Sequence, residues 1–256
     1  MTVAADGPAP SRMLRLTHIG PRSLSFLLWL LLTAAAPAKD KPPQVPNIRW
    51  TEGNPGCTFS HDDDGKYRWG LWADDIGVIL AVDSQELQRT HRRIQPFFAV
   101  LLTVRYSGTE KLDVAGGRLS LEFVKHSHVV KHPLDPHDFA IEIEKDAKEV
   151  VNQTERQIQK HPAQREKKET LLRDYQRQLE ELLDFVTTRS LRGATLDPAN
   201  PETKGWIFFS TRDKWIGGWK KQEKFVLRFP LQKRVFEFPL TLPPAKEDLI
   251  LRRRPN

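Results

Sequence analysis

Cysteine is almost absent from this chain of 256 residues, in which Cys57 is the only one. An intramolecular disulfide is therefore excluded, and the protein must rely for its core on apolar residues, which make up 39% of the chain. A lone thiol of this kind is usually buried and inert. The alternatives are a disulfide-linked dimer or a reactive nucleophile, but the sequence offers no activating base beside Cys57.

Motifs that assemble catalytic or phosphate-binding groups are missing as well. The chain has no glycine-rich phosphate loop, no Gly-x-Ser-x-Gly and no His-Glu-x-x-His. The pair Asp74-Asp75 is expected in a turn, because adjacent strand residues face opposite sides of a sheet. Residues 61–65 lack the alternating oxygen ligands of a calcium loop and are expected to form a plain turn. We therefore expect neither an enzyme nor a bound cofactor.

The positive charge of the chain comes without a nucleic-acid-binding motif. The formal net charge is +7, and it falls to +5 without residues 1–38, because that segment holds three arginines and one aspartate. Much of the remaining excess lies in residues 214–234 and in a basic tail, residues 245–256. We expect an ordinary solvated surface and no nucleic-acid partner.

Residues 1–38 have the pattern of an export signal. Three arginines precede an apolar run at residues 24–32, which is short for a membrane span, and residues 36–38 (Ala-Pro-Ala) match a cleavage site. Cleavage there predicts a periplasmic or extracellular protein without a stable membrane span, beginning with a proline-rich linker at residues 39–47. The alternative is a membrane anchor that is not cleaved. Met13 is an alternative start.

Two regions of the chain, residues 48–134 and 193–244, read as short strands separated by turns. Neither region has enough strands to bury two faces, so we expect them to pair with each other as one discontinuous β-sandwich. We expect antiparallel pairing, since no helix lies between successive strands in either region. The expected strands are residues 67–72, 77–82, 96–104, 119–124, 205–210, 224–229 and 235–240.

The intervening residues 135–192 have a helical periodicity instead. Their apolar positions recur every three or four residues, and His161-Pro162 interrupts the pattern, which predicts an α-helical hairpin with arms of about 25 residues. The second arm carries a short heptad pattern from Leu172 to Val186, and Gly193 is placed to end it in a left-handed cap. The hairpin either binds a partner or packs its apolar stripe on itself and on the sheet.

Three segments carry a resemblance to a known group of proteins. They are residues 105–108 (RYSG) at the end of an apolar strand, residues 195–198 (TLDP) and residues 205–209 (GWIFF). Together they resemble immunoglobulin-like domains of uncharacterised exported bacterial proteins. The resemblance covers the two β regions and not the helical one. It implies a fold and an exported location but no activity.

Histidines form one candidate site. His126 and His128 are two residues apart and are expected on one face of a strand, and His132 follows closely. Imidazole pairs of this kind can hold copper or zinc. Exposed histidines on an edge strand explain the pattern equally well.

A second candidate site is a turn rich in tryptophan and lysine. Trp215 and Trp219 flank two glycines, and Lys214, Lys220 and Lys221 surround them. Such a patch can stack on sugar rings or hold an anionic polymer. In the alternative, both tryptophans fold over the rim of the sandwich.

These observations predict a mainly β protein, α+β overall: an immunoglobulin-like antiparallel β-sandwich with an inserted helical hairpin. We expect an exported, non-catalytic binding or structural module of the cell envelope. Its partner would be an unidentified protein or envelope polymer, bound through the hairpin or the Trp215–Trp219 turn. The alternative is a periplasmic copper or zinc protein that uses His126 and His128.

Overall fold

The computed structural model describes residues 45–83, 97–211 and 222–244. The chain divides into two units, Met1–Gln44 and Val45–Asn256, and all of the described residues belong to the second. Strands account for 42% of them and helices for 32%, so the protein is mainly β. No helix among these residues is long and apolar enough to cross a membrane.

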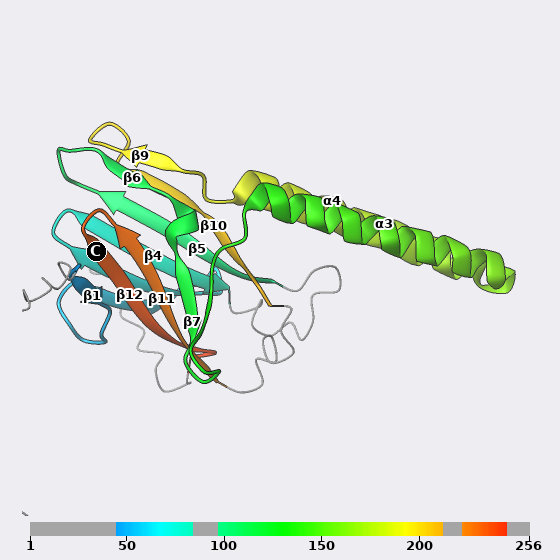
Figure 1. The fold of residues 1–256 in the computed structure, drawn as a ribbon, viewed down its shortest axis with the longest axis horizontal. Helices are drawn as coiled ribbons and strands as arrows, with labels where there is room; N and C mark the ends of the chain where they lie inside the picture. Colours follow the sequence, from blue (N-terminus) through cyan, green and yellow to red (C-terminus); the bar gives the residue numbers. More distant parts are fainter. Residues whose placement is uncertain (1–44, 84–96, 212–221, 245–256) are drawn as a thin grey trace, which may run out of the picture. The chain divides into compact units, whose positions relative to one another are not determined.

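Two five-stranded sheets form the body of the described unit (Figure 1). The first sheet has the order β10-β5-β4-β3-β2, with β10 at Glu202–Ser210, β5 at Phe97–Tyr106, β4 at Ile76–Asp83, β3 at Lys66–Ala73 and β2 at Cys57–His61. The second has the order β1-β12-β11-β7-β8, with β1 at Asn47–Arg49, β12 at Arg234–Leu242, β11 at Glu223–Leu231, β7 at Ser120–Phe123 and β8 at Val129–Lys131. A small third sheet pairs β6 (Leu112–Val114) with β9 (Ala194–Leu196), and a 3-10 turn, Gly116–Arg118, follows β6.

Strands from before and after the helices share both large sheets. β5 pairs with β10 along nine residues, and β7 pairs with β11 from Phe123 opposite Phe225 to Ser120 opposite Arg228. The expectation of purely antiparallel pairing is wrong at one edge, where β1 and β12 run parallel. These two strands are separated by nearly the whole described chain, so no short connection restricts their relative direction.

One hydrophobic core lies between the two large sheets. It takes alternate residues of the first sheet, such as Phe98 and Val100, and of the second, such as Phe225 and Leu227. Phe98 and Phe225 stack with their ring centroids 6.1 Å apart, which places side chains of the two sheets in direct contact. Cys57 is buried at the edge of this core, and its Sγ accepts a hydrogen bond from the Thr51 amide at 3.4 Å.

Two helices of 25 residues each follow the edge of the second sheet: α3 at Pro136–Lys160 and α4 at Arg165–Arg189. The carboxylate of Asp135 caps α3 by accepting the amide N–H groups of His137 and Asp138, and Pro136 occupies the first turn, where its missing amide is not needed. A 3-10 turn, Pro162–Gln164, joins the helices, as the His161-Pro162 break predicts. Lys168 Nζ on α4 donates to Gln157 Oε1 on α3 at 3.1 Å, so the helices run side by side in opposite directions. We call residues 136–189 the helix pair.

The base of the helix pair packs on the outer face of the first sheet. Phe97, Ala99 and Phe208 alternate with the inward residues of β5 and β10 and form a second cluster with Phe139, Ile143 and Val186 of the helices. The Phe97 ring meets the rings of Phe139 and Phe208 edge to face, each at 5.4 Å. Because both faces of β5 are covered there, its residues 97–102 are a continuous apolar run and not an alternating pattern.

The outer edge of β10 is closed by the segments that lead into and out of the helices. The Leu134 amide donates to the Phe208 carbonyl at 2.8 Å, and the Leu191 amide donates to the Trp206 carbonyl at 2.9 Å. The approach is so close at Gly205 that a Cβ there would lie 2.3 Å from Leu191 Cα.

This arrangement overturns the expected role of Gly193. Helix α4 ends at Arg189, the backbone of its C-cap residue Ser190 is extended, and Gly193 is not among the described residues with positive φ. The chain pairs with the sheet edge at Leu191, so the helix ends earlier than the glycine suggests.

Candidate functional site

The helix pair is the region whose surface is least explained by packing. Helix α3 buries Phe139, Ala140, Ile143 and Ala147, and α4 buries only Val186. From residue 148 to residue 185 no side chain is buried. The heptad positions Leu172, Tyr175, Leu179 and Leu182 are half-buried, and burial together with the nearby charge of Asp146 raises the pKa of Tyr175. More than half of the helix pair therefore presents its side chains to solvent or to a partner.

Charge is unevenly distributed along the helix pair. We define the tip as residues 156–173 and the shaft as residues 136–155 and 174–189. The tip holds six basic and two acidic residues, a net charge of +4, whereas the shaft holds ten acidic and four basic residues, a net charge of −6. Some charges pair locally, such as Arg165 with Glu169 at 2.7 Å, but most tip cations, among them Lys160, Lys167 and Arg173, are exposed.

A pocket of about 300 Å³ lies where the helix pair meets the sheets. Its walls come from the segments on both sides of the helices and from β10, including Leu134, Leu191 and Trp206. Asp135 is the one ionisable residue among those that line it, and its Oδ1 already accepts the amides that cap α3. The pocket thus offers apolar walls and backbone groups but no pair of acid and base.

The histidines lie in a turn and not on a strand, so that expectation is wrong. Strand β7 ends at Phe123, the His126 amide donates to the Phe123 carbonyl, and His128 has a positive φ of 57°. His126 Nε2 lies 3.1 Å from Glu223 Oε2, and His128 Nδ1 contacts Glu122 Oε1. His132 is exposed beyond β8.

Among the described residues, the fold does not bring further metal ligands to these histidines. Across residues 45–83, 97–211 and 222–244, no group of three or more His, Cys, Asp or Glu side chains is placed to hold a metal ion. The copper or zinc hypothesis therefore still rests on the sequence spacing of the histidines. The second candidate site, Trp215 and Trp219 with Lys214, Lys220 and Lys221, lies outside the described residues.

His128 belongs to a row of ionic contacts that crosses the second sheet. Arg49 and Arg228 both bind the buried carboxylate of Glu237, at 2.6 and 2.8 Å, and Arg228 also contacts Glu122. Glu122 in turn contacts His128. Hydrogen bonds from His128 and Arg228 hold the pKa of Glu122 below its usual value. Two arginines of the row satisfy the carboxylate of Glu237, the one acidic side chain that is buried in the described part of the chain, which indicates a structural role for the row.

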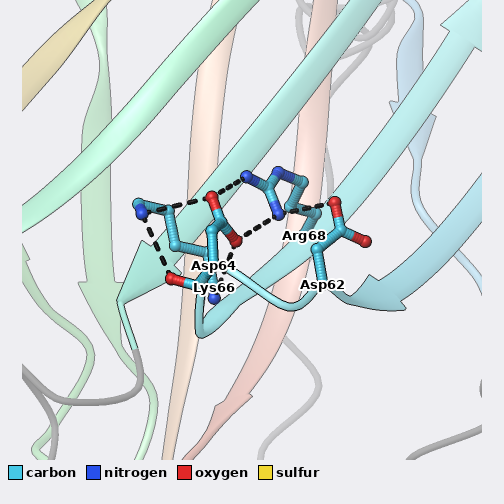
Figure 2. A network of polar contacts seen from close by, with 4 residues as sticks. All are labelled: Asp62, Asp64, Lys66 and Arg68. Carbon is cyan, nitrogen blue, oxygen red and sulfur yellow. Dashed lines mark hydrogen bonds and ion pairs between the residues drawn. The ribbon is translucent and has the colours of Figure 1, made fainter.

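Two of the three aspartates in the acidic turn between β2 and β3 are paired with basic residues of β3 (Figure 2). Arg68 bridges Asp62 at 2.7 Å and Asp64 at 2.5 Å, and Lys66 lies 3.2 Å from Asp64. The hydrogen bond from Arg68 holds the pKa of Asp64 well below its ordinary range. Gly65 takes the positive φ of the turn, so this segment is the plain turn that its sequence predicts.

Sequence reasoning missed two features of these surfaces. The row from Arg49 to His128 depends on which strands are neighbours, and strand order has no local signal. The division of the helix pair into a basic tip and an acidic shaft was detectable, because a charge count along the two predicted helices shows it once they are folded against each other.

Comparison with known proteins adds no relative: no family model, no curated protein and no solved structure matches this chain.

Proposed function

We propose that this protein is an exported, non-catalytic binding or structural module of the cell envelope, in which a β-sheet body holds an αα-hairpin that contacts a partner. The observation that carries the proposal is the contrast within the helix pair. Its base is anchored by the cluster around Phe97 and Phe208, whereas residues 148–185 bury no side chain. Leu179, Leu182, Leu183 and Phe185 pack partly against this cluster, but ordering some forty residues without a fully buried side chain costs conformational entropy, which favours a role outside folding.

The order of the strands supports an immunoglobulin-like sandwich as the body. In such folds the second strand, B, pairs with E, while G, F, C and C′ form the opposite sheet. Taking β5 as B and β10 as E, the other sheet runs β12-β11-β7-β8, which is the order G-F-C-C′. The helix pair then occupies the connection between C′ and E. Strands β2 and β3 extend the first sheet beyond this pattern.

The aromatic contact between the sheets fits the same comparison. Antibody-type domains join strands B and F by a disulfide. Here the equivalent strands are joined by the stacked rings of Phe98 and Phe225, in a chain whose single cysteine excludes that bond. A hydrophobic contact is able to replace the disulfide because both rings are almost fully buried.

The exported location rests on the pattern of residues 1–38 and has its own test. Intact-mass spectrometry of the protein recovered from its producing cell should give a chain that begins at Lys39. A mass that retains residues 1–38 in secreted material would contradict export by cleavage.

The role of the helix pair is tested by shortening it in register. Because Gln157 faces Lys168, deletion of residues 151–157 together with residues 168–174 removes about two turns from each helix and leaves the anchored base intact. The shortened protein should unfold at the same denaturant concentration as the original but should no longer sediment with the native envelope fraction. The Ile141→Ala variant, altered at an exposed position of the shaft, is the matched control. Equal sedimentation of all three proteins would contradict the proposed role.

A further inference from the structure

The charge at the start of helix α4 runs against what helix stability favours. The amino-terminal end of a helix favours acidic residues and the carboxyl-terminal end favours basic ones. Helix α3 follows this rule, with Asp138 in its first turn and Lys160 in its last. Helix α4 instead begins with Arg165, Lys167 and Lys168 beside the acidic Glu166, although its last turn holds the favourable Arg189. The basic residues at the start of α4 therefore need an explanation other than the stability of the helix.

Two exposed apolar side chains lie near the boundary between the shaft and the tip. Val150 on α3 is 39% exposed and Leu171 on α4 is 58% exposed. The contact of Gln157 with Lys168 sets the register of the helices and brings Leu171 level with Thr154, about one turn along the axis from Val150. Val150 near the end of the shaft and Leu171 in the tip thus form an apolar centre at the boundary between the two charged regions.

We infer that this surface binds a second copy of the same chain, with the two helix pairs side by side and antiparallel. The inference rests on the proposed role of the helix pair as the contact element and names its partner. A two-fold axis near Val150 and Leu171 would set the tip of each copy against the shaft of the other, level with Glu144 and Glu180. The same contact would then form twice, as in an isologous dimer, and would cover the apolar centre.

A second copy accounts for more of this surface than an anionic polymer does. A polymer would meet the +4 tip, but it would be repelled by the −6 shaft and would leave Val150 and Leu171 exposed. In the antiparallel pair, each of the three regions has a complementary region on the partner.

Charge reversal tests the inference on the purified protein. A tip variant (Lys160→Glu, Lys167→Glu, Arg173→Glu) and a shaft variant (Glu144→Lys, Glu149→Lys, Glu180→Lys) both alter exposed residues. Sedimentation equilibrium at low salt should show a dimer of the original protein, with a Kd that rises at least about tenfold in either variant and in about 0.5 M NaCl. An equimolar mixture of the two variants should associate again, because the reversed tip then faces the reversed shaft. The control variant (Lys111→Glu, Lys204→Glu, Lys233→Glu) makes the same change of net charge as the tip variant, but on the body, and should remain dimeric.

Three results would overturn the inference: a monomer at all concentrations, a dimer that neither variant weakens, or variants that dissociate alone and fail to associate when mixed. Circular dichroism of each variant shows whether the helices are intact. If the protein is a monomer and its sedimentation with the envelope still depends on the length of the helix pair, self-association is ruled out while the proposed function stands. If the original protein alone sediments with anionic polymer and stays monomeric, the tip binds that polymer and not a second copy.

Discussion

Strand β5 and the helix pair lie in contact, yet they use their residues in opposite ways. Nine of the ten residues of β5 are buried, since one of its faces meets the opposite sheet and the other meets the helices. The two helices together have 50 residues and bury five. Packing thus constrains nearly every side chain of the strand, whereas most of the helical surface is free to be shaped by charge and by a partner. Substitutions in the core, at the base of the helix pair and at its tip should therefore differ in the size and sign of their effects.

The largest effect is expected in the core between the sheets. Phe225 is 2% exposed, and its ring contacts Phe123 at 4.9 Å and Phe98 at 6.1 Å. Phe225→Ala should lower the free energy of unfolding by about 3–5 kcal/mol, because it removes a ring and leaves a cavity. Chemical denaturation measures the loss. A cost below about 1 kcal/mol, as for an exposed site, would contradict a shared core.

The base of the helix pair should be the next most sensitive place. Ile143 is fully buried against the sheet, whereas Ile141, on the same helix, is 52% exposed. Ile143→Ala should cost about 2–3 kcal/mol and Ile141→Ala less than about 0.5 kcal/mol. Hydrogen exchange should show faster exchange in α3 and α4 of the Ile143→Ala variant than in the strands. Similar losses for both substitutions would mean that burial does not distinguish the two faces of α3.

The same contrast explains which parts of the fold could be predicted from sequence. Strand β11 and helices α3 and α4 were located to within a few residues, because an apolar periodicity and a proline break are local signals. The prediction that Gly193 ends α4 was wrong. The amide of Leu191 is instead bound by the edge of β10, and the helical periodicity of the sequence gives no sign of this contact. The parallel pairing of β1 with β12 likewise has no local signal.

The candidate sites were predicted less well than the fold. The turn that holds His126 and His128 was read as strand because it contains no glycine, proline or asparagine, and its left-handed residues are Ser127 and His128. Their carboxylate partners, Glu223 and Glu122, come from strand order that the sequence does not display. Charge along the helix pair was countable in advance, but its meaning depends on the register of the two helices.

A smaller effect is expected where the helix pair begins. Asp135 accepts two amide hydrogen bonds, from His137 at 2.9 Å and from Asp138 at 3.2 Å. Asp135→Ala should cost about 1 kcal/mol of stability, whereas Asp135→Asn keeps an acceptor and should cost much less. Thermal unfolding followed by circular dichroism compares the two variants. Equal losses would show that the negative charge, and not the cap, is what matters at this position.

The ionic row on the second sheet should add a small, pH-dependent term. Hydrogen bonds from His128 and then Arg228 lower the folded-state pKa of Glu122, so its contribution is present above the unfolded value, about 4.3, and is lost as pH falls through the lower folded value. Glu122→Gln should lower the stability at pH 7 by less than about 1 kcal/mol, because Arg228 and His128 are partly exposed. The difference between the two proteins should shrink below about pH 4. A difference that is constant from pH 7 to pH 3 would assign the effect to packing.

The smallest expected effect is a gain in stability and not a loss. It gives the most direct contrast between the helix pair and the β-sheet body. Lys167 is exposed in the first turn of α4, where the helix dipole disfavours a positive charge. Lys167→Glu should therefore raise the stability of the folded chain slightly, by about 0.3 kcal/mol, measured at a protein concentration low enough to keep it monomeric. The same substitution should weaken self-association, because it reduces the charge of the tip that faces the partner's shaft. In the β-sheet body, the substitutions above lower stability because they remove a packing contact. At the tip, Lys167 itself lowers the stability of the helix, but it lies where it can contact the shaft of a second copy. If Lys167→Glu instead lowers the stability and leaves the Kd of self-association unchanged, the role of Lys167 is in folding.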